Sequence, residues 1–324
     1  MADLPAERLQ TDPPFSYVGL DIFGPWEVIA RRTRGGQANS KRWAVLFTCM
    51  ATRAVHIEVI EAMSSSSFIN ALRRFFAIRG PAKQLRSDCG TNFVGASKEL
   101  KLGPLKPGEM SVDNYLLSQR CSWVFNPPYS SHMGGTWERM IGIARRILDS
   151  MLLQAKVTKL THEVLTTLMA EVTAIINARP LVPVSSDPIA PLILTPSTLL
   201  TQKVGAVSPL PGGFTKADMF TYQWKKVQVL ADIFWARWQK EYLNLLQSRQ
   251  KWQVNRPNIK EGDIVLLRDK LLKRNDWPMG VIVKALPSKD GQVRKVEVKI
   301  FHHKTTKTFF RPISECILLL SPTD

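Results

Sequence analysis

The sequence has few cysteines and histidines, and their positions argue against several kinds of site. The 4 cysteines among 324 residues form no CxxC pair, which argues against a disulfide framework or a zinc knuckle and fits a reducing compartment. Of the 5 histidines only His302 and His303 are adjacent, and that spacing does not suggest a tetrahedral metal site. Metal binding through thiolate or imidazole side chains is therefore not indicated.

Long apolar runs are also missing. No stretch reaches the roughly 18 apolar residues that a membrane-spanning helix needs. The N-terminal segment MADLPAERLQTDPP has acids and prolines where a secretory signal has a basic start and an apolar run. The sequence therefore indicates neither export nor a membrane location.

Acidic residues are outnumbered throughout the chain. There are 44 Lys and Arg against 27 Asp and Glu, giving a net charge of +17 and a pI near 9.9. Residues 216–324 hold 21 basic against 11 acidic residues, a net charge of +10, and the first 215 residues hold 23 against 16, a net charge of +7. This excess favours a polyanionic partner over a merely solvated basic surface, and it predicts the denser contact for the C-terminal part.

Short β-rich and helical segments alternate in the first part of the chain. Gly24-Pro25 is expected to stop the first strand, and Gly80-Pro81 to end the first helix, which the serines at 64–67 can cap. This order predicts a mixed α/β domain with a five-stranded mixed sheet and flanking helices. The expected strands are Phe15–Phe23, the two halves of Lys41–Ile60, Lys83–Asp88 and Trp123–Asn126; the expected helices are 68–79, Thr136–Ala155 and His162–Asn177.

The second part of the chain differs in character. A Pro-rich stretch, 180–213, is typical of a connector, and the helical segment 218–253 is rich in tryptophan, which we interpret first as packing and second as a subunit interface. From Asp263 short β segments alternate with turns, as in a small β-barrel of about five strands. We therefore expect a tail (1–12), a core domain (13–180), a connector with Trp-rich helices (181–257) and a C-terminal domain (258–324).

Three acids stand out because they lie at the expected strands and helix of a basic protein. Asp21 is in the middle of the first strand, Asp88 at the end of the fourth, and Glu138 near the start of the helix after the fifth. Each alone is explained by a cap or a surface position. If the first and fourth strands pair, the three carboxylates can approach one another and hold divalent cations for phosphoryl transfer. Arg145 follows Glu138 on one helix face, where it can meet a phosphate.

The flanks of these acids resemble those of a known family. Asp21 lies in VGLDIFGP, Asp88 in RSDCGTNF and Glu138 in NPPYSSHMGGTWERMIG. These motifs are similar to the catalytic core of retroviral-type integrases, which are DDE polynucleotidyl transferases, and most closely to the BEL/Pao class of LTR retrotransposons. The similarity continues through YQWKKVQVLADIFWARWQKEYLNLLQSRQKW and GDIVLLRD and covers essentially the whole chain.

The resemblance implies an RNase H-like core in which Asp21, Asp88 and Glu138 bind two Mg²⁺ or Mn²⁺ ions. Family members trim the 3′ ends of the retroelement DNA and join each 3′-hydroxyl to target DNA by transesterification, with no small-molecule cofactor. By position, Asp21 would bridge both ions, while Asp88 would complete the site of the nucleophile and Glu138 that of the leaving oxygen, or these two roles are reversed.

The resemblance also suggests DNA contacts. Asn92 would orient a phosphate or a carboxylate, or else stabilise a turn; Tyr129 would stack on a base, or its loop merely connects. The C-terminal β segments resemble the SH3-like barrel of such integrases, whose basic side chains would contact phosphates without sequence preference, unless they are simply solvated. These side chains are Lys270, Lys273, Arg274, Lys284, Arg294, Lys295 and Lys299.

Two departures leave other interpretations open. Cys89 stands where many relatives have Asn, and no His-His-Cys-Cys zinc domain precedes the core, so we expect the sequence to be part of a longer polyprotein or a gene model opened at an internal Met. The main hypothesis is an integrase that forms homo-oligomers on DNA in the nucleus, after a cytoplasmic stage before import. The alternatives are a catalytically silent, element-derived DNA- or chromatin-binding protein and an RNase H-type nuclease acting on an RNA strand.

Overall fold

The computed structural model describes most of the chain as two compact units. The described residues are 11–33, 36–87, 116, 119–125, 135–154, 160–183, 193–203, 208–246, 258–269, 273–302 and 305–321. Unit 1 comprises residues 1–177, 199–201 and 210–234, and unit 2 comprises residues 178–198, 202–209 and 235–324. The long helix α7 (Gln223–Leu246) contributes its first half to unit 1 and its second half to unit 2.

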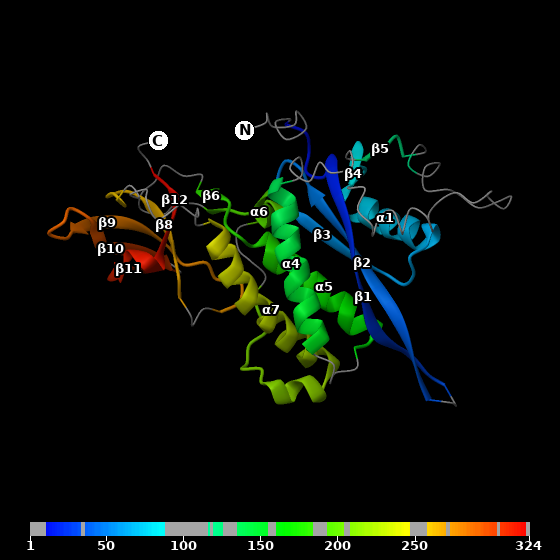
Figure 1. The fold of residues 1–324 in the computed structure, drawn as a ribbon. Helices are drawn as coiled ribbons and strands as arrows, with labels where there is room; N and C mark the ends of the chain where they lie inside the picture. The colour runs from blue at the N-terminus through cyan, green and yellow to red at the C-terminus, as the bar shows by residue number, and fades with distance from the viewer. Residues whose placement is uncertain are drawn as a thin grey trace. The chain divides into compact units, whose positions relative to one another are not determined.

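Unit 1 is built on a five-stranded mixed sheet with the strand order β3-β2-β1-β4-β5 (Figure 1). Strand β1 pairs with β2 antiparallel and with β4 parallel, and β4 pairs with β5 parallel. The mixed sheet with flanking helices confirms that part of the prediction. The strands are β1 (Tyr17–Thr33), β2 (Gly36–Cys49), β3 (Val55–Ile60), β4 (Gln84–Ser87) and β5 (Ser122–Phe125).

The prediction that Gly24-Pro25 stops the first strand is wrong. Strand β1 continues to Thr33, and its register against β2 shifts between Phe23 and Trp26. Gly24 has φ +112°, and a Cβ there would lie 3.1 Å from the carbonyl oxygen of Arg42. The dipeptide therefore forms a bulge, which changes the pairing locally and leaves the ladder intact on both sides.

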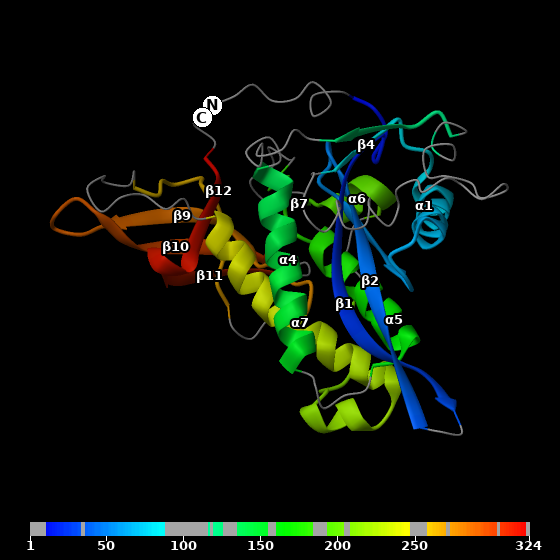
Figure 2. The same cartoon turned by 45° about the vertical axis from the view of Figure 1, so that its right-hand side comes forward.

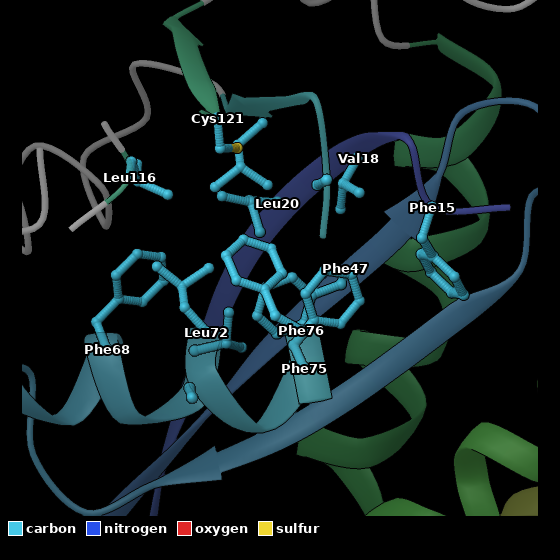
Figure 3. Packing of buried hydrophobic residues seen from close by; sticks show 14 of the residues in the cluster. Phe15, Val18, Leu20, Phe47, Phe68, Leu72, Phe75, Phe76, Leu116 and Cys121 are labelled. Atoms are coloured by element: carbon cyan, nitrogen blue, oxygen red, sulfur yellow. The ribbon is translucent and has the colours of Figure 1, made fainter. Parts of the chain in front are cut away.

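One face of the sheet is covered by helix α1 (Ser65–Arg79). Ser64 caps it by accepting a hydrogen bond from the backbone N–H of Ser67, and Gly80 ends it at φ +86°, as the sequence predicts. Figure 3 shows the aromatic and aliphatic side chains of α1 pointing toward those of the strands. Within this core the rings of Phe47 and Phe75 stack with centroids 4.2 Å apart.

The other face of the sheet carries helices α4 (Gly135–Gln154) and α5 (His162–Asn177), with α4 against β1 and α5 against β3 (Figures 1 and 2). Helix α4 packs through an apolar stripe, since Ile141, Ala144, Leu148 and Met151 are all buried. Unit 1 is therefore a sheet between two helical layers.

The edge strand β3 is closed by a side chain from α5. The Asn177 amide Oδ1 accepts a hydrogen bond from the Val55 N–H at 2.8 Å, and Asn177 Nδ2 donates to the Val55 carbonyl at 2.8 Å. Asn177 is 4% exposed. One amide therefore satisfies both outward-facing backbone groups of Val55 at the start of the edge strand.

Unit 2 contains a five-stranded antiparallel sheet with the order β11-β10-β9-β8-β12. No pairing between β11 and β12 closes this sheet among the residues that the structure describes. Its strands are β8 (Ile264–Leu267), β9 (Met279–Pro287), β10 (Val293–His302), β11 (Thr305–Pro312) and β12 (Cys316–Leu320), with the 3-10 turn η4 (Ile313–Glu315) before the last.

The core of this sheet depends on a glycine. A Cβ on Gly280 of β9 would lie 2.4 Å from Val298 Cγ1 on the neighbouring strand, so any larger residue would force the two strands apart. Valines of β8 and β10 fill the interior beside it, with Val265, Val296 and Val298 fully buried.

The remaining short elements are β6 (Val182–Pro183), β7 (Ile193–Leu194), α6 (Pro196–Thr201) and the 3-10 turn η3 (Lys216–Phe220).

We predict that Asn177→Ala destabilises unit 1 by about 3 kcal/mol, because it leaves the buried N–H and C=O of Val55 without partners. Urea unfolding measures this change. Thr167→Ala is the matched control: its hydroxyl donates within α5 to the Glu163 carbonyl and is exposed, so its loss should change stability by no more than about 0.5 kcal/mol. Equal effects of the two substitutions would contradict the role of Asn177.

Candidate active site

Asp21 lies on the face of β1 that is opposite the aromatic core. Val18, Leu20 and Ile22 alternate with it and belong to the cluster under α1, whereas the Asp21 carboxylate is 33% exposed on the side of α4. The sheet therefore holds a carboxylate in the middle of its central strand at a position that reaches the surface.

The pairing of β1 with β4 fixes what lies beside this carboxylate. The parallel register aligns Tyr17 with Gln84 and Leu20 with Ser87, which is the last residue of β4. The prediction that the first and fourth strands are neighbours is confirmed. Asp88, the next residue in the sequence, lies outside the described residues, as do Asn92 and Tyr129.

Helix α4 supplies the groups that face Asp21. Glu138 lies in its first turns, but the structure does not describe its side chain. Two turns later, Arg145 Nη1 lies 3.9 Å from Asp21 Oδ2, and Arg145 Nε lies 3.9 Å from Asp149 Oδ2. The predicted face of α4 is thus the one turned toward Asp21, and Arg145 stands between two carboxylates.

Asp149 and Trp26 join this group, and the sequence-based prediction of site residues had not included them. Burial raises the pKa of the Asp149 carboxyl, and the Arg145 guanidinium and the Trp26 indole offset only part of that effect. Trp26 is buried, with its ring edge-on to Phe23 at a centroid distance of 5.4 Å. The helical spacing of Arg145 and Asp149 was a visible signal; the approach of Trp26 depends on the bulge in β1.

The residue types suit a magnesium site. Mg²⁺ prefers carboxylate oxygens, and the Asp21 side chain, which is 33% exposed, presents such oxygens at the surface. Among the described residues no three His, Cys, Asp or Glu side chains gather. Two of the three predicted ligands are outside the described side chains, so Asp21 is the ligand whose surroundings the structure gives.

The basic side chains of unit 2 fall into two groups. In the first, Glu297 of β10 pairs with Lys284 of β9 and with Phe310 of β11, so these three share one face of the sheet. Lys295 lies on the same face, with its Nζ 4.6 Å from the centroid of the Phe310 ring, and Phe310 is 53% exposed. Lys299 follows two residues after Glu297 on this face.

The second group comprises the other four predicted side chains, which are not placed on this face by strand pairing. Arg274 is only 5% exposed, so in this conformation its guanidinium is not on a surface that meets DNA. Arg294 donates to both carboxylate oxygens of Asp290, one of the contacts being 2.9 Å. Lys273 is exposed, and Lys270 is not described.

The structure describes three of the four cysteines. Cys49, Cys121 and Cys316 are buried and free, and burial raises the pKa of the Cys121 and Cys316 thiols to about 11. The thiols of Cys121 and Cys316 are therefore protonated, and all three cysteines pack in the interior. Of the helices that the structure describes, none has the length and apolar character needed to cross a membrane.

Comparison with known proteins adds the following. The model of DUF5641, a family of unknown function, matches residues 222–319. No curated protein matches the chain. A chain of the cryo-EM structure of the simian T-cell lymphotropic virus intasome in complex with PP2A regulatory subunit B56 gamma is similar at 12% identity and TM-score 0.39, covering 99% of this chain and 85% of that chain.

The integrase catalytic core domain of HTLV-2 in complex with magnesium is also similar. Its trimeric form gives 14% identity and TM-score 0.35, covering 58% of this chain and 97% of that chain. Its dimeric form gives 14% identity and TM-score 0.32, covering 51% and 88%. These TM-scores are all below 0.5.

We predict that the free energy of unfolding of Asp149→Asn, taken relative to that of the wild type, is higher at neutral pH than at about pH 4, the ordinary range of an aspartate. A raised pKa means that the folded state holds a proton that the unfolded state has lost, so wild-type stability falls as the pH rises through this interval. The asparagine variant cannot lose this proton, so its stability should not fall in this way. Urea unfolding of both proteins at several pH values between about 4 and 7 measures the free energies of unfolding.

Asp290→Asn is the control with the opposite sign. The Arg294 guanidinium and the backbone N–H of Gln292 lower the pKa of Asp290, so its contribution is present above the ordinary range and is lost as the pH falls. If the stability of both variants relative to the wild type changed in the same direction with pH, the raised pKa of Asp149 would be contradicted.

Proposed function

We propose that the protein is an integrase-like polynucleotidyl transferase that processes the 3′ ends of retroelement DNA and joins them to target DNA. The observation that carries this proposal is the register of β1 against β4. It aligns Leu20 with Ser87, the residues that directly precede Asp21 and Asp88 in the sequence. If the register continues for one residue, the two carboxylates become neighbours at the same end of the sheet.

In this proposal Asp21, Asp88 and Glu138 hold two divalent cations, Mg²⁺ or Mn²⁺, at the surface of the sheet. Such ions, when bound, stabilise the attacking and leaving oxygens of an in-line phosphoryl transfer. Asp21 would supply its carboxylate from the central strand of the sheet. Arg145, 3.9 Å from Asp21, would bind the phosphate next to the reacting one and keep the local charge balanced.

Further parts of the proposal concern the rest of the chain. The motifs favour the BEL/Pao class, an RNase H-like core at 13–180, a connector at 181–257 and an SH3-like DNA-binding domain at 258–324. The antiparallel sheet of unit 2 supports the last of these, because Lys284 and Lys295 share an open face with the exposed Phe310. Retroelement terminal DNA, target DNA and further copies of the chain are the proposed partners, in the nucleus.

We predict that Asp21→Asn and Asp88→Asn each reduce strand transfer by at least about 100-fold, since loss of a metal ligand removes several kcal/mol of transition-state stabilisation. The assay uses the full chain, Mg²⁺ or Mn²⁺ and a DNA duplex with a recessed 3′ end, together with the reverse reaction, disintegration. Asp276→Asn, a partly exposed aspartate of unit 2, is the matched control and should keep wild-type activity.

Wild-type activity in Asp88→Asn would overturn the proposed mechanism. A wild-type protein that binds DNA but neither transfers nor disintegrates would instead indicate the silent DNA-binding protein. Cleavage of an RNA strand in an RNA–DNA hybrid without strand transfer would indicate the nuclease.

We also predict that Lys284→Glu and Lys295→Glu weaken duplex DNA binding and each reduce the slope of log affinity against log salt by about 0.9, the value for one lost phosphate contact. Fluorescence anisotropy at several salt concentrations measures the slope. Arg73→Glu, an equal charge change on the exposed side of α1, should leave the slope nearer to that of the wild type. An unchanged slope in both lysine variants would remove this face from the DNA interface.

A further inference from the structure

The segment that leads into α7 presents three large aromatic side chains to the surface. Phe220 is 66% exposed, Tyr222 63% and Trp224 51%. They lie at the end of η3 and the start of α7, in unit 1, drawn yellow-green in Figure 1. An aromatic side chain has roughly 200 Å² to bury, so the three side chains together leave about 360 Å² uncovered, within the range of the largest apolar patch of a typical monomer.

These rings are exposed although their surroundings are ordered. Asp218 accepts hydrogen bonds from the Thr215 N–H at 2.9 Å and from Lys225 Nζ at 3.0 Å. Lys225 Nζ in turn lies 5.7 Å from the centroid of Tyr222 and 5.8 Å from that of Trp224. The lysine is therefore fixed between the two rings by a carboxylate on a neighbouring turn.

Trp224 has a second support. Phe214 meets its ring edge-on, with centroids 5.9 Å apart and planes at 89°. This contact covers one part of the indole and leaves 51% of the residue exposed. The rings are thus held in defined orientations without being buried, an arrangement that lowers the entropy lost when a flat ligand stacks on them.

The charge of the segment selects the kind of ligand. Residues 208–226 contain Lys216, Lys225 and Lys226 against the single acid Asp218, a net charge of +2. Asp218 is paired with Lys225, so its negative charge is already compensated. Protein–protein interfaces are depleted in lysine at their cores, whereas sites for single-stranded nucleic acid combine exposed aromatic rings with basic side chains.

The exposed rings also distinguish single strands from duplexes. In a duplex the faces of the bases are covered by their neighbours in the stack, so protruding rings meet only the backbone. In a single strand each base can leave its neighbours and stack on an aromatic side chain. Lys216 and Lys226, the other two lysines of the segment, supply the net positive charge that favours the phosphates of the same strand.

We propose that Phe220, Tyr222 and Trp224, with the neighbouring lysines, form a binding site for single-stranded DNA in which unpaired bases stack on the rings. This site is separate from the carboxylates near Asp21 and needs no metal ion. Removing nucleotides from a 3′ end leaves the opposite strand unpaired, so the proposed chemistry would itself generate such a ligand; this last link rests on the proposed function.

The test measures the affinity of the full chain for a fluorescent oligothymidine of about 16 nucleotides by anisotropy, without divalent cations. Tyr222→Ala and Trp224→Ala should each weaken binding about 5- to 150-fold, the loss of one stacked base. Tyr222→Phe and Trp224→Phe keep a ring and should retain most of the affinity. Ile78→Ala removes a 60% exposed apolar side chain elsewhere in unit 1 and should have no effect.

Further arms separate the alternatives. Affinity for a duplex of the same sequence should change little in the alanine variants. An equal loss for duplex DNA, a loss confined to single-stranded RNA, or unchanged oligothymidine binding in both alanine variants would each overturn the proposal. A change in oligomeric state by light scattering with unchanged oligothymidine binding would identify the patch as a contact between copies instead. The Tyr222 and Trp224 variants should lose the same oligothymidine affinity when they also carry Asp21→Asn. The binding site is therefore tested independently of the proposed catalysis.

Discussion

The parallel pairing of β1 with β4 is the constraint on which the arrangement of unit 1 depends. It makes β1 the central strand, paired on both sides, so its side chains must alternate between the two helical layers. Leu20 and Ile22 enter the core under α1, and Asp21 points to α4. A slip of one residue would place the Asp21 carboxylate among phenylalanines and the leucine at the surface. Because burying an unpaired charge is so costly, the register that forms the core is also the register that exposes the acid.

The two faces of the sheet consequently have different chemistry. Under α1 the contacts are aromatic and close, as in the stacked pair Phe47 and Phe75. Beneath α4 a carboxylate, a guanidinium and a second carboxylate follow one another at 3.9 Å, far enough apart that no pair is locked by a short hydrogen bond between these groups. At the edge of the sheet, Asn177 ends the ladder at β3. The aromatic core thus supports, from the opposite side of the sheet, the polar face on which the proposed site would lie.

The sequence predicted the elements that depend on local signals. Helix α1 begins and ends where Ser64 and Gly80 indicate, and helix α5 has the predicted bounds. It also placed Arg145 on the helix face that meets Asp21, because helical periodicity fixes which residues share a face. It failed at Gly24-Pro25, where the pairing of β1 with β2 on both sides of the dipeptide outweighs its tendency to form a turn.

Longer-range partners escaped prediction for a physical reason: periodicity identifies a face but not what covers it. Asn177 could not be matched to Val55, which is 122 residues away, and Trp26 could not be matched to Asp149. The tryptophans of α7 were all interpreted alike. Trp235 and Trp238 are indeed buried, at 5% and 0% exposed, whereas Trp224 is 51% exposed. The difference arises because Phe214 and Lys225 support Trp224 from the side and leave the rest of its surface open.

The same reasoning limits what the net charge of +17 can mean. Several cations are engaged with neighbouring acids: Arg74 with Glu58, Lys225 with Asp218 and Arg294 with Asp290. These pairs cancel much of their own field at a distance, and Arg274 is buried. The charge that a polyanion meets therefore comes from lysines that outnumber the acids of their own face, as Lys284, Lys295 and Lys299 do around Glu297. One of these, Lys295, lies beside the exposed ring of Phe310, whereas Lys225 beside Trp224 is already paired with Asp218. Composition predicted the polyanion, but only the folded arrangement separates the cations that can bind it from those that stabilise the fold.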